Sequence, residues 1–320
     1  IYNFVSGDET SGAHSIARAT LETGFGNTLV SGAVYTMTIS ATDAASNAAT
    51  PVDSTAIIFD ATSPVISLVT PATNSIINAG FSANYTLSEA VSSGTITFTQ
   101  TSGTADVNPH TYNFVSGDQT SGAHSITRSS LETGFGNTLV DGAIYTMTVS
   151  ATDTASNAAT PVSNTGIAYL NTAPIISFVT PTSNSTINAV FSANYTLSKA
   201  VASGTITFTQ TGGTADANPH TYNFVSGDQT LGAHSIARTT LETGFGNTLV
   251  SGAIYTMTVS ATDAASNAAT PISNTGIAYL NTAPVISSVT PVTSSSVNSA
   301  FSANYTLSES VASGTITFTQ

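Results

Sequence analysis

The sequence predicts an all-β protein made of tandem β-sandwich domains, and three observations lead to that prediction. A repeat of 110 residues runs through the chain: the heptapeptide YNFVSGD begins at Tyr2 and returns at Tyr112 and Tyr222. Apolar and small polar residues alternate with a period of two, which is typical of half-buried strands. Turn-forming Gly, Asn, Asp and Pro residues separate these stretches. A second segment supports this period, because the decapeptide LETGFGNTLV also recurs at intervals of 110 residues.

Proline-bearing segments mark where one repeat stops and the next begins. They end at Pro64, Pro174 and Pro284, and each follows an apolar run that reads as a last strand. Linkers of a few residues favour an extended array. The predicted division is the later part of a repeat in residues 1–60, complete repeats in 64–170 and 174–280, and the front part of a repeat in 284–320.

Each complete repeat is expected to contain about seven strands around one core. The positions that share the inward phase of their strands are Phe81, Tyr85, Leu87, Ile96, Phe98, Tyr145, Met147 and Val149. About seven strands in about 110 residues fit an aligned β-sandwich. Helix is poorly supported, since β-branched residues, Gly and Pro interrupt the windows, and only 129–133 is expected to form a short helical turn.

Composition excludes several classes of partner. Four Lys and Arg stand against 17 Asp and Glu, for a net charge of −13. Nucleic acid and anionic membranes are therefore not expected to bind, because both need clustered cations. No apolar run approaches the roughly 20 residues that span a bilayer, so no membrane insertion is expected in this segment. Without cysteine there are no disulfides or thiolate metal sites.

One stretch of the repeat carries a resemblance to a known family. Gly142 precedes the strand that starts near Tyr145, and the strand runs into the hairpin ATDTASN that begins at Ala151. This pattern resembles the tandem bacterial immunoglobulin-like repeats of large surface and adhesin-type proteins. The resemblance implies tandem immunoglobulin-like β-sandwich domains in an extended array, located outside the cell or at its surface. Two features depart from the family pattern: Ser156 replaces a hairpin glycine, and leucine replaces the junction aspartate of Asp60 in the later copies.

A tyrosine recurs just after the glycine of each repeat, as Tyr35, Tyr145 and Tyr255. A tyrosine at this place in a sandwich can donate or accept a hydrogen bond with nearby backbone, forming a tyrosine corner. These three residues are predicted to serve the fold and not chemistry.

Calcium is the only metal for which the sequence offers candidate ligands, and no other cofactor is expected. Asp43 and Asn47 flank a tight hairpin, and Asp60 adds a carboxylate at the first junction. The alternative is that Asp43 and Asn47 close an Asx turn with their own backbone. Calcium needs six to eight oxygens. Because Leu170 and Leu280 supply no carboxylate, the melting temperature is expected to depend little on calcium at the later junctions.

Four asparagines match the acceptor pattern for N-glycosylation: Asn84, Asn184, Asn194 and Asn304. The histidines and the recurring Glu132 form no motif of a metal site, a catalytic triad or a paired acid and base. Hydrogen-bonded surface or loop roles are expected for them, and the chain is predicted not to be an enzyme.

The sequence favours a structural repeat of an extracellular filament, stalk or surface fibre whose partners are copies of itself. One version is head-to-tail polymerisation, in which 284–320 of one chain and 1–60 of the next complete a sandwich by strand complementation. The ten residues missing at that join match the loop 101–110, where a break is expected to cost no core strand. The alternative is a glycan-binding or cell-adhesion module of a large bacterial adhesin, with cell-surface glycans as partners.

Overall fold

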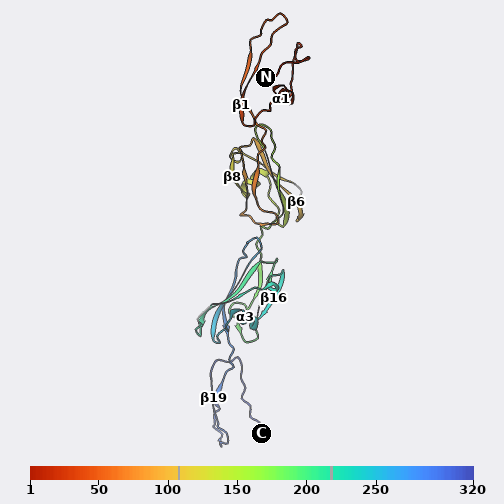
Figure 1. Cartoon of the computed structure of the whole chain (residues 1–320). Helices are drawn as coiled ribbons and strands as arrows, with labels where there is room; N and C mark the ends of the chain where they lie inside the picture. The colour runs from red at the N-terminus through yellow and green to blue at the C-terminus, as the bar shows by residue number, and fades with distance from the viewer. Residues whose placement is uncertain (107–108, 217–218) are drawn as a thin grey trace. The chain divides into compact units, whose positions relative to one another are not determined.

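The computed structural model describes residues 1–106, 109–216 and 219–320 of the chain (Figure 1). It divides into two compact units, Ile1–Asn171 and Thr172–Gln320. Each unit contains one complete β-sandwich and one partial repeat. The chain is all-β, and its α-helices are eight residues long in the described part.

The first unit holds the complete sandwich formed by residues 64–170. Its elements are β3 (Ile66–Thr70), β4 (Ile76–Ile77), β5 (Ser82–Leu87), β6 (Ser93–Gly103), β7 (His110–Asn113), the 3₁₀-helix η1 (Ser116–Asp118), β8 (Gly122–Thr127), α2 (Arg128–Phe135), β9 (Ala143–Thr152) and β10 (Val162–Tyr169). One sheet has the order β3-β5-β8 and the other β4-β10-β9-β6-β7. All neighbours are antiparallel except β4 and β10.

The second unit repeats this sandwich in residues 174–280. Its elements are β11 (Ile176–Thr180), β12 (Thr186–Ile187), β13 (Ser192–Leu197), β14 (Ser203–Gly213), β15 (His220–Asn223), η2 (Ser226–Asp228), β16 (Gly232–Ala237), α3 (Arg238–Phe245), β17 (Ala253–Thr262) and β18 (Ile272–Tyr279). The sheets β11-β13-β16 and β12-β18-β17-β14-β15 have the same order as in the first unit. The two complete repeats, whose sequences are closely similar, therefore have the same strand pairing.

Partial repeats flank the two sandwiches. The first unit begins with α1 (Arg18–Phe25), β1 (Ala33–Ile39) and β2 (Val52–Phe59), and β1 pairs with β2 in an antiparallel sheet. The second unit ends with β19 (Ile286–Thr290) paired to β20 (Asn304–Leu307). Both pairs keep the strand register of the complete repeats.

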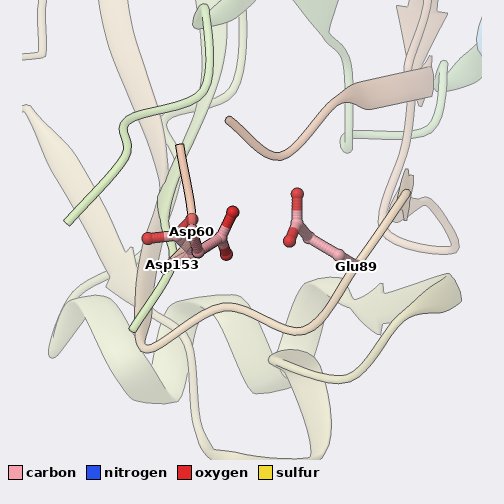
Figure 2. A group of neighbouring side chains, drawn as sticks. All are labelled: Asp60, Glu89 and Asp153. Atoms are coloured by element: carbon pink, nitrogen blue, oxygen red, sulfur yellow. The ribbon is translucent and has the colours of Figure 1, made fainter. Parts of the chain in front are cut away.

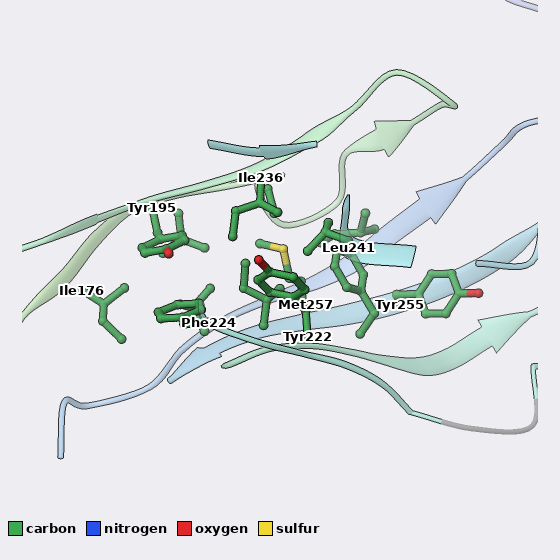
Figure 3. Close-up of a cluster of buried hydrophobic side chains, with 14 of the residues drawn as sticks. Ile176, Tyr195, Tyr222, Phe224, Ile236, Leu241, Tyr255 and Met257 are labelled. Atoms are coloured by element: carbon green, nitrogen blue, oxygen red, sulfur yellow. The ribbon is translucent and has the colours of Figure 1, made fainter. Parts of the chain in front are cut away.

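The core lies between the two sheets, as the alternation predicts. Of the eight core positions predicted for the first sandwich, seven are buried, and Phe81 is half-buried with its ring against Phe98 and Tyr169. Figure 3 shows the corresponding core of the second sandwich, where Tyr255 and Met257 from β17 meet Leu241 of α3. Burying one face of each strand fixes its register, since a shift by one residue would turn the core side chains outward.

Two elements go beyond the sequence prediction. Among the residues that the structure describes, each sandwich has eight strands, because the two-residue β4 and β12 join the larger sheet beside β10 and β18. The helical turn expected at 129–133 is the longer α2, which begins after Thr127, whose hydroxyl accepts a hydrogen bond from Ser130 N. Leu131 of this helix is fully buried, so tertiary packing supports a helix that local preference alone disfavours.

Candidate cation site at the first repeat junction

Asp60 follows the last residue of β2 and lies at the junction between the partial repeat and the first sandwich. Its carboxylate oxygen Oδ1 accepts hydrogen bonds from Thr62 N at 2.9 Å and from Ser31 Oγ at 3.2 Å. Its carbonyl accepts a hydrogen bond from Asn157 Nδ2 at 3.1 Å. These bonds hold the junction residue against a hairpin that is 97 residues further along the chain.

Asp153 belongs to that hairpin, which follows β9. Its Oδ1 accepts from Asn157 N at 2.8 Å, and its Oδ2 accepts from Asn157 Nδ2 at 2.9 Å. The residue is only 2% exposed. This is an Asx-type closure of a tight turn, and it aims a buried carboxylate at the junction.

Glu89 supplies a third carboxylate from the loop between β5 and β6. The ligand oxygens of Asp60, Glu89 and Asp153 all lie within 4.8 Å of one another. Figure 2 shows the Glu89 carboxylate facing the pair formed by Asp60 and Asp153. Within the described residues, this is the group of His, Asp and Glu side chains that gathers closely enough to hold a metal ion.

The arrangement suits a hard divalent cation in its donor type. Three carboxylates offer up to six oxygens, and oxygen ligands are those that Ca²⁺ prefers, whereas zinc and copper sites typically use imidazole or thiolate. The acids come from three separate segments, so a shared cation would tie the junction residue Asp60 to two loops of the sandwich.

The structure does not bring Asp43 and Asn47 to Asp60, although the sequence grouped these three residues. Asn47 donates to Asp43 from its backbone and from its side chain, both at 2.8 Å, within their own hairpin. Asp43 follows the C-terminal end of β1, whereas Asp60 follows Phe59, which pairs with Ala33 at the N-terminal end of β1. The seven residues of β1 put roughly 20 Å between these two ends. The aspartate that reaches Asp60 is the next copy of Asp43, namely Asp153.

The pKa of Asp153 lies below its ordinary value, even though its surroundings include other acids. Burial acts to raise this pKa, but the hydrogen bonds donated by the side chain and backbone of Asn157 outweigh burial. The pKa of Asp43 is also lowered, chiefly by the Asn47 side chain. The hairpin aspartate is therefore ionised at neutral pH and can act as a ligand.

Each predicted tyrosine corner has its hydroxyl on nearby backbone. Val140 N donates to the Tyr145 hydroxyl at 2.8 Å, and Val30 N and Val250 N make the same bond to Tyr35 and Tyr255. The Tyr145 hydroxyl in turn donates to Asp106 Oδ2 at 2.8 Å. Burial, together with the bond to Asp106, raises the pKa of Tyr145.

A buried histidine completes this network and was not expected from the sequence. His110 is 2% exposed, its Nε2 pairs with Asp106, and its Nδ1 lies 2.6 Å from Asn137 Oδ1. The spacing Asp-x-x-x-His, which recurs at Asp216 and His220, was the available signal. His124 differs from the expected loop histidine, because it lies half-buried on β8, where its Nε2 bonds to Thr120 O and its ring stacks on Tyr85.

The loop 101–110 is consequently not free of core structure, which corrects the expectation that a break there costs no strand. Strand β6 continues to Gly103, and β7 begins at His110. Asp106 and His110 both belong to the buried network, while residues 107 and 108 lie outside the described part.

The asparagines that match the glycosylation pattern have two different settings. Asn84 and Asn194 are half-buried on strands, and each donates from Nδ2 to a threonine hydroxyl at 2.8 Å; Asn304 donates in the same way at 2.9 Å. Asn184 lies exposed in a turn with a φ of 60°. A glycan on a strand asparagine would have to replace an existing hydrogen bond, whereas Asn184 is the more accessible acceptor.

The described chain contains no helix long and apolar enough to cross a membrane. No family model matches the sequence, and no curated protein matches it. The chain is therefore assigned a fold and not a family.

Solved structures that match the chain include fibronectin type III and fibronectin(III)-like domains. The FN1–FN3 domains of chicken CNTN1 are 13% identical with a TM-score of 0.34, covering 78% of this chain and 77% of that chain. The fibronectin(III)-like modules of Clostridium thermocellum CbhA are 14% identical with a TM-score of 0.30, covering 67% and 94%. A two-domain fibronectin type III segment of chicken tenascin is 14% identical with a TM-score of 0.27, covering 64% and 94%. These values carry no information on ligand or activity, and the β-sandwich fold rests on the strand pairing itself.

Proposed function

We propose that the chain is a structural segment of an extracellular fibre, stalk or surface filament, in which each sandwich is a repeated spacer without enzymatic activity. The observation that carries the proposal is that the two complete repeats build the same buried network. His220 Nε2 lies 2.5 Å from Asp216 Oδ2, and the Tyr255 hydroxyl donates to the same oxygen at 2.7 Å. Their counterparts in the first sandwich make the same contacts. These shared contacts hold each sandwich together, which is what a repeated spacer requires.

The surfaces of the repeats also favour a spacer over a glycan-binding module. Glycan sites usually present aromatic side chains to the sugar, and the chain has no Trp. Within the described part of the two complete repeats, Phe178 is the one aromatic residue among the exposed large hydrophobic side chains. Its counterparts in the other copies are Leu68 and Ser288, so no aromatic platform repeats.

A glycan array with the 320-residue chain, together with electron microscopy of the native assembly from which it derives, tests the proposal. We expect no glycan bound above background and a repeating assembly of sandwiches. Saturable binding to a defined glycan, lost on Phe178→Ser but retained on Leu68→Ser, would instead make the chain an adhesion module.

Strand complementation is a finer version of the same proposal. Core positions of the two partial repeats are exposed in the 320-residue chain: Met37 and Phe318 are exposed, whereas their counterparts Met147 and Phe98 are fully buried. A sandwich assembled from 284–320 and 1–60 would nevertheless lack the equivalents of Asp106 and His110, so we expect it to be less stable than a complete repeat. Light scattering on the purified chain tests this version: concentration-dependent polymers support it, and a monomer at high concentration excludes it.

A further inference from the structure

One position of the repeat changes charge between the copies. Glu89 of the first sandwich corresponds to Lys199 of the second, and Lys199 is the only lysine in the chain. Along with it, Asp60 is replaced by Leu170, while Asp153 is retained as Asp263. Two of the three acids, Asp60 and Glu89, are therefore both replaced in the second unit. The change is from three carboxylates to one carboxylate and one ammonium.

In the second unit the ammonium of Lys199 is bound by two oxygens. Its Nζ donates to Asp263 Oδ2 at 2.8 Å and to Thr172 O at 2.8 Å. The Asp263 side chain is 1% exposed, and Asn267 holds it in the hairpin as Asn157 holds Asp153. A cation thus lies between the hairpin aspartate and the carbonyl of the linker residue Thr172.

In the first unit the equivalent oxygens have no ammonium beside them among the described residues. Asp153 keeps the place of Asp263, Thr62 keeps the place of Thr172, and Glu89 and Asp60 bring two further carboxylates. Three like charges within 4.8 Å, one of them buried, repel one another unless a positive charge is present. The position of the missing positive charge is given by the second unit.

We propose that Lys199 is a covalently attached replacement for a divalent cation, and that the first junction binds such a cation through Asp60, Glu89 and Asp153. The bound ammonium of the second unit is an observation independent of the acidic cluster, and it shows that a cation is stable on the hairpin aspartate and the linker carbonyl. Oxygen-only ligands and a cluster charge of −3 select a hard ion of calcium type. The first junction is then ion-dependent, and the second unit carries its own positive charge.

Calorimetric titration of calcium chloride into the full 320-residue chain tests the first half of the proposal. We expect binding of one calcium ion per chain, with magnesium at least about tenfold weaker because it dehydrates reluctantly. Glu89→Lys, which copies the second unit, is expected to abolish the binding. Glu309→Lys is the matched control, because it makes the same change at the same repeat position away from the cluster, and it should leave the titration unchanged.

Hydrogen exchange gives a second readout that does not depend on heat of binding. Calcium is expected to slow amide exchange in peptides covering 56–68, and to leave peptides covering 166–178 unchanged. Glu89→Gln, which preserves shape, should remove most of the protection if Glu89→Lys fails to fold. A chain that shows neither binding nor protection at millimolar calcium would overturn the cation site.

The reciprocal change tests the replacement itself. Lys199→Glu should create a second calcium site, weaker than the first because it has two carboxylates instead of three. Lys199→Met removes the ammonium without adding a carboxylate, so it should create no site and should speed exchange at Thr172. If Lys199→Glu gains no calcium while the unmodified chain binds one, Lys199 is an ordinary ion pair and the replacement idea is wrong.

Discussion

Phenylalanines of this repeat differ in burial according to their place in a strand: Phe98 lies on the inward face of β6, whereas Phe178 lies at the bulge of β11 with a positive φ. Phe98 is fully buried and contacts the rings of Phe81, Phe135 and Tyr145, whereas Phe178 is 83% exposed. Edge-to-face ring contacts add to the area that Phe98 removes from water. The hydrophobic contribution of a phenylalanine is therefore set by its place in the register.

Phe98→Ala should lower the free energy of unfolding of the first sandwich by roughly 3–5 kcal/mol, through lost burial and a residual cavity. Phe178→Ala should change that of the second sandwich by less than about 0.5 kcal/mol. The measurement is urea unfolding followed by circular dichroism. In Phe98→Ala the first sandwich should unfold at a lower urea concentration than the second, so that two transitions become visible. Equal small effects would contradict the assigned core.

The tyrosine corner is the second prediction at this scale. Tyr145→Phe removes the hydroxyl that joins Val140 N to the buried Asp106 carboxylate, and both groups lose a partner. Asp106 keeps its bond to His110, but Val140 N is left without its acceptor, and because an unsatisfied buried polar group costs about 1–3 kcal/mol we expect a loss in that range. Tyr305→Phe, at an exposed tyrosine of the last partial repeat, is the control and should be neutral. A neutral Tyr145→Phe would mean that water replaces the hydroxyl.

At the scale of elements, the first strand of each sandwich contains a residue with left-handed backbone. Leu68 has a φ of 50° and is 77% exposed, and the register of β3 with β5 shifts between Ser67 and Thr70. Such a bulge twists an edge strand and disfavours pairing with another chain. The cost is backbone strain at a residue whose side chain is mostly exposed.

Leu68→Gly should relieve that strain, and Leu68→Val should increase it. We expect the glycine variant to be more stable than the valine variant by about 1–2 kcal/mol, since a branched side chain fits the left-handed region poorly. Val65→Gly, at an exposed residue without positive φ, should destabilise instead. Thermal melting of the three variants measures the order, and a glycine variant below valine would show that the bulge is not strained.

Two elements could not be predicted from local sequence. The strand β4 is two residues long and exists because Ile76 and Ile77 pair with Ala168 and Tyr169, more than 90 residues away. Helix α2 contains Gly134, which disfavours helix, yet Leu131 gains a buried position in the core. Local propensity is a weak prior, and tertiary burial overrode it in both cases.

For the whole molecule, the repeated tyrosines predict an alkaline transition. Burial, then the hydrogen bond to Asp118, raises the pKa of Tyr112 to about 12, and Tyr222 is raised to about 12 by burial and Asp228. A raised folded-state pKa means that the stabilisation is complete below the unfolded value of about 10. It is lost as pH rises through about 12.

Both sandwiches should therefore lose stability between about pH 10 and pH 12, measured as a falling urea midpoint, and tyrosine absorbance should change together with circular dichroism where they unfold. Tyr112→Phe should reduce the dependence on pH in the first sandwich and leave the second as an internal reference. If Tyr112 and Tyr222 titrated near pH 10 while the circular dichroism of the β-sheets was unchanged, the assigned burial of their hydroxyls would be contradicted.

The sequence by itself determined the length of the repeat, the all-β class and the inward face of most strands. The repeat length follows from identical segments 110 residues apart, and the class and inward faces follow from a period of two within single strands. Only the tertiary structure decided that Asp60 meets Asp153 and Glu89, that His110 is buried against Asp106, and that Lys199 reaches Asp263. The physical reason is that each of these contacts depends on which segments the two sheets bring together, and no local pattern encodes a pairing between loops that are tens of residues apart.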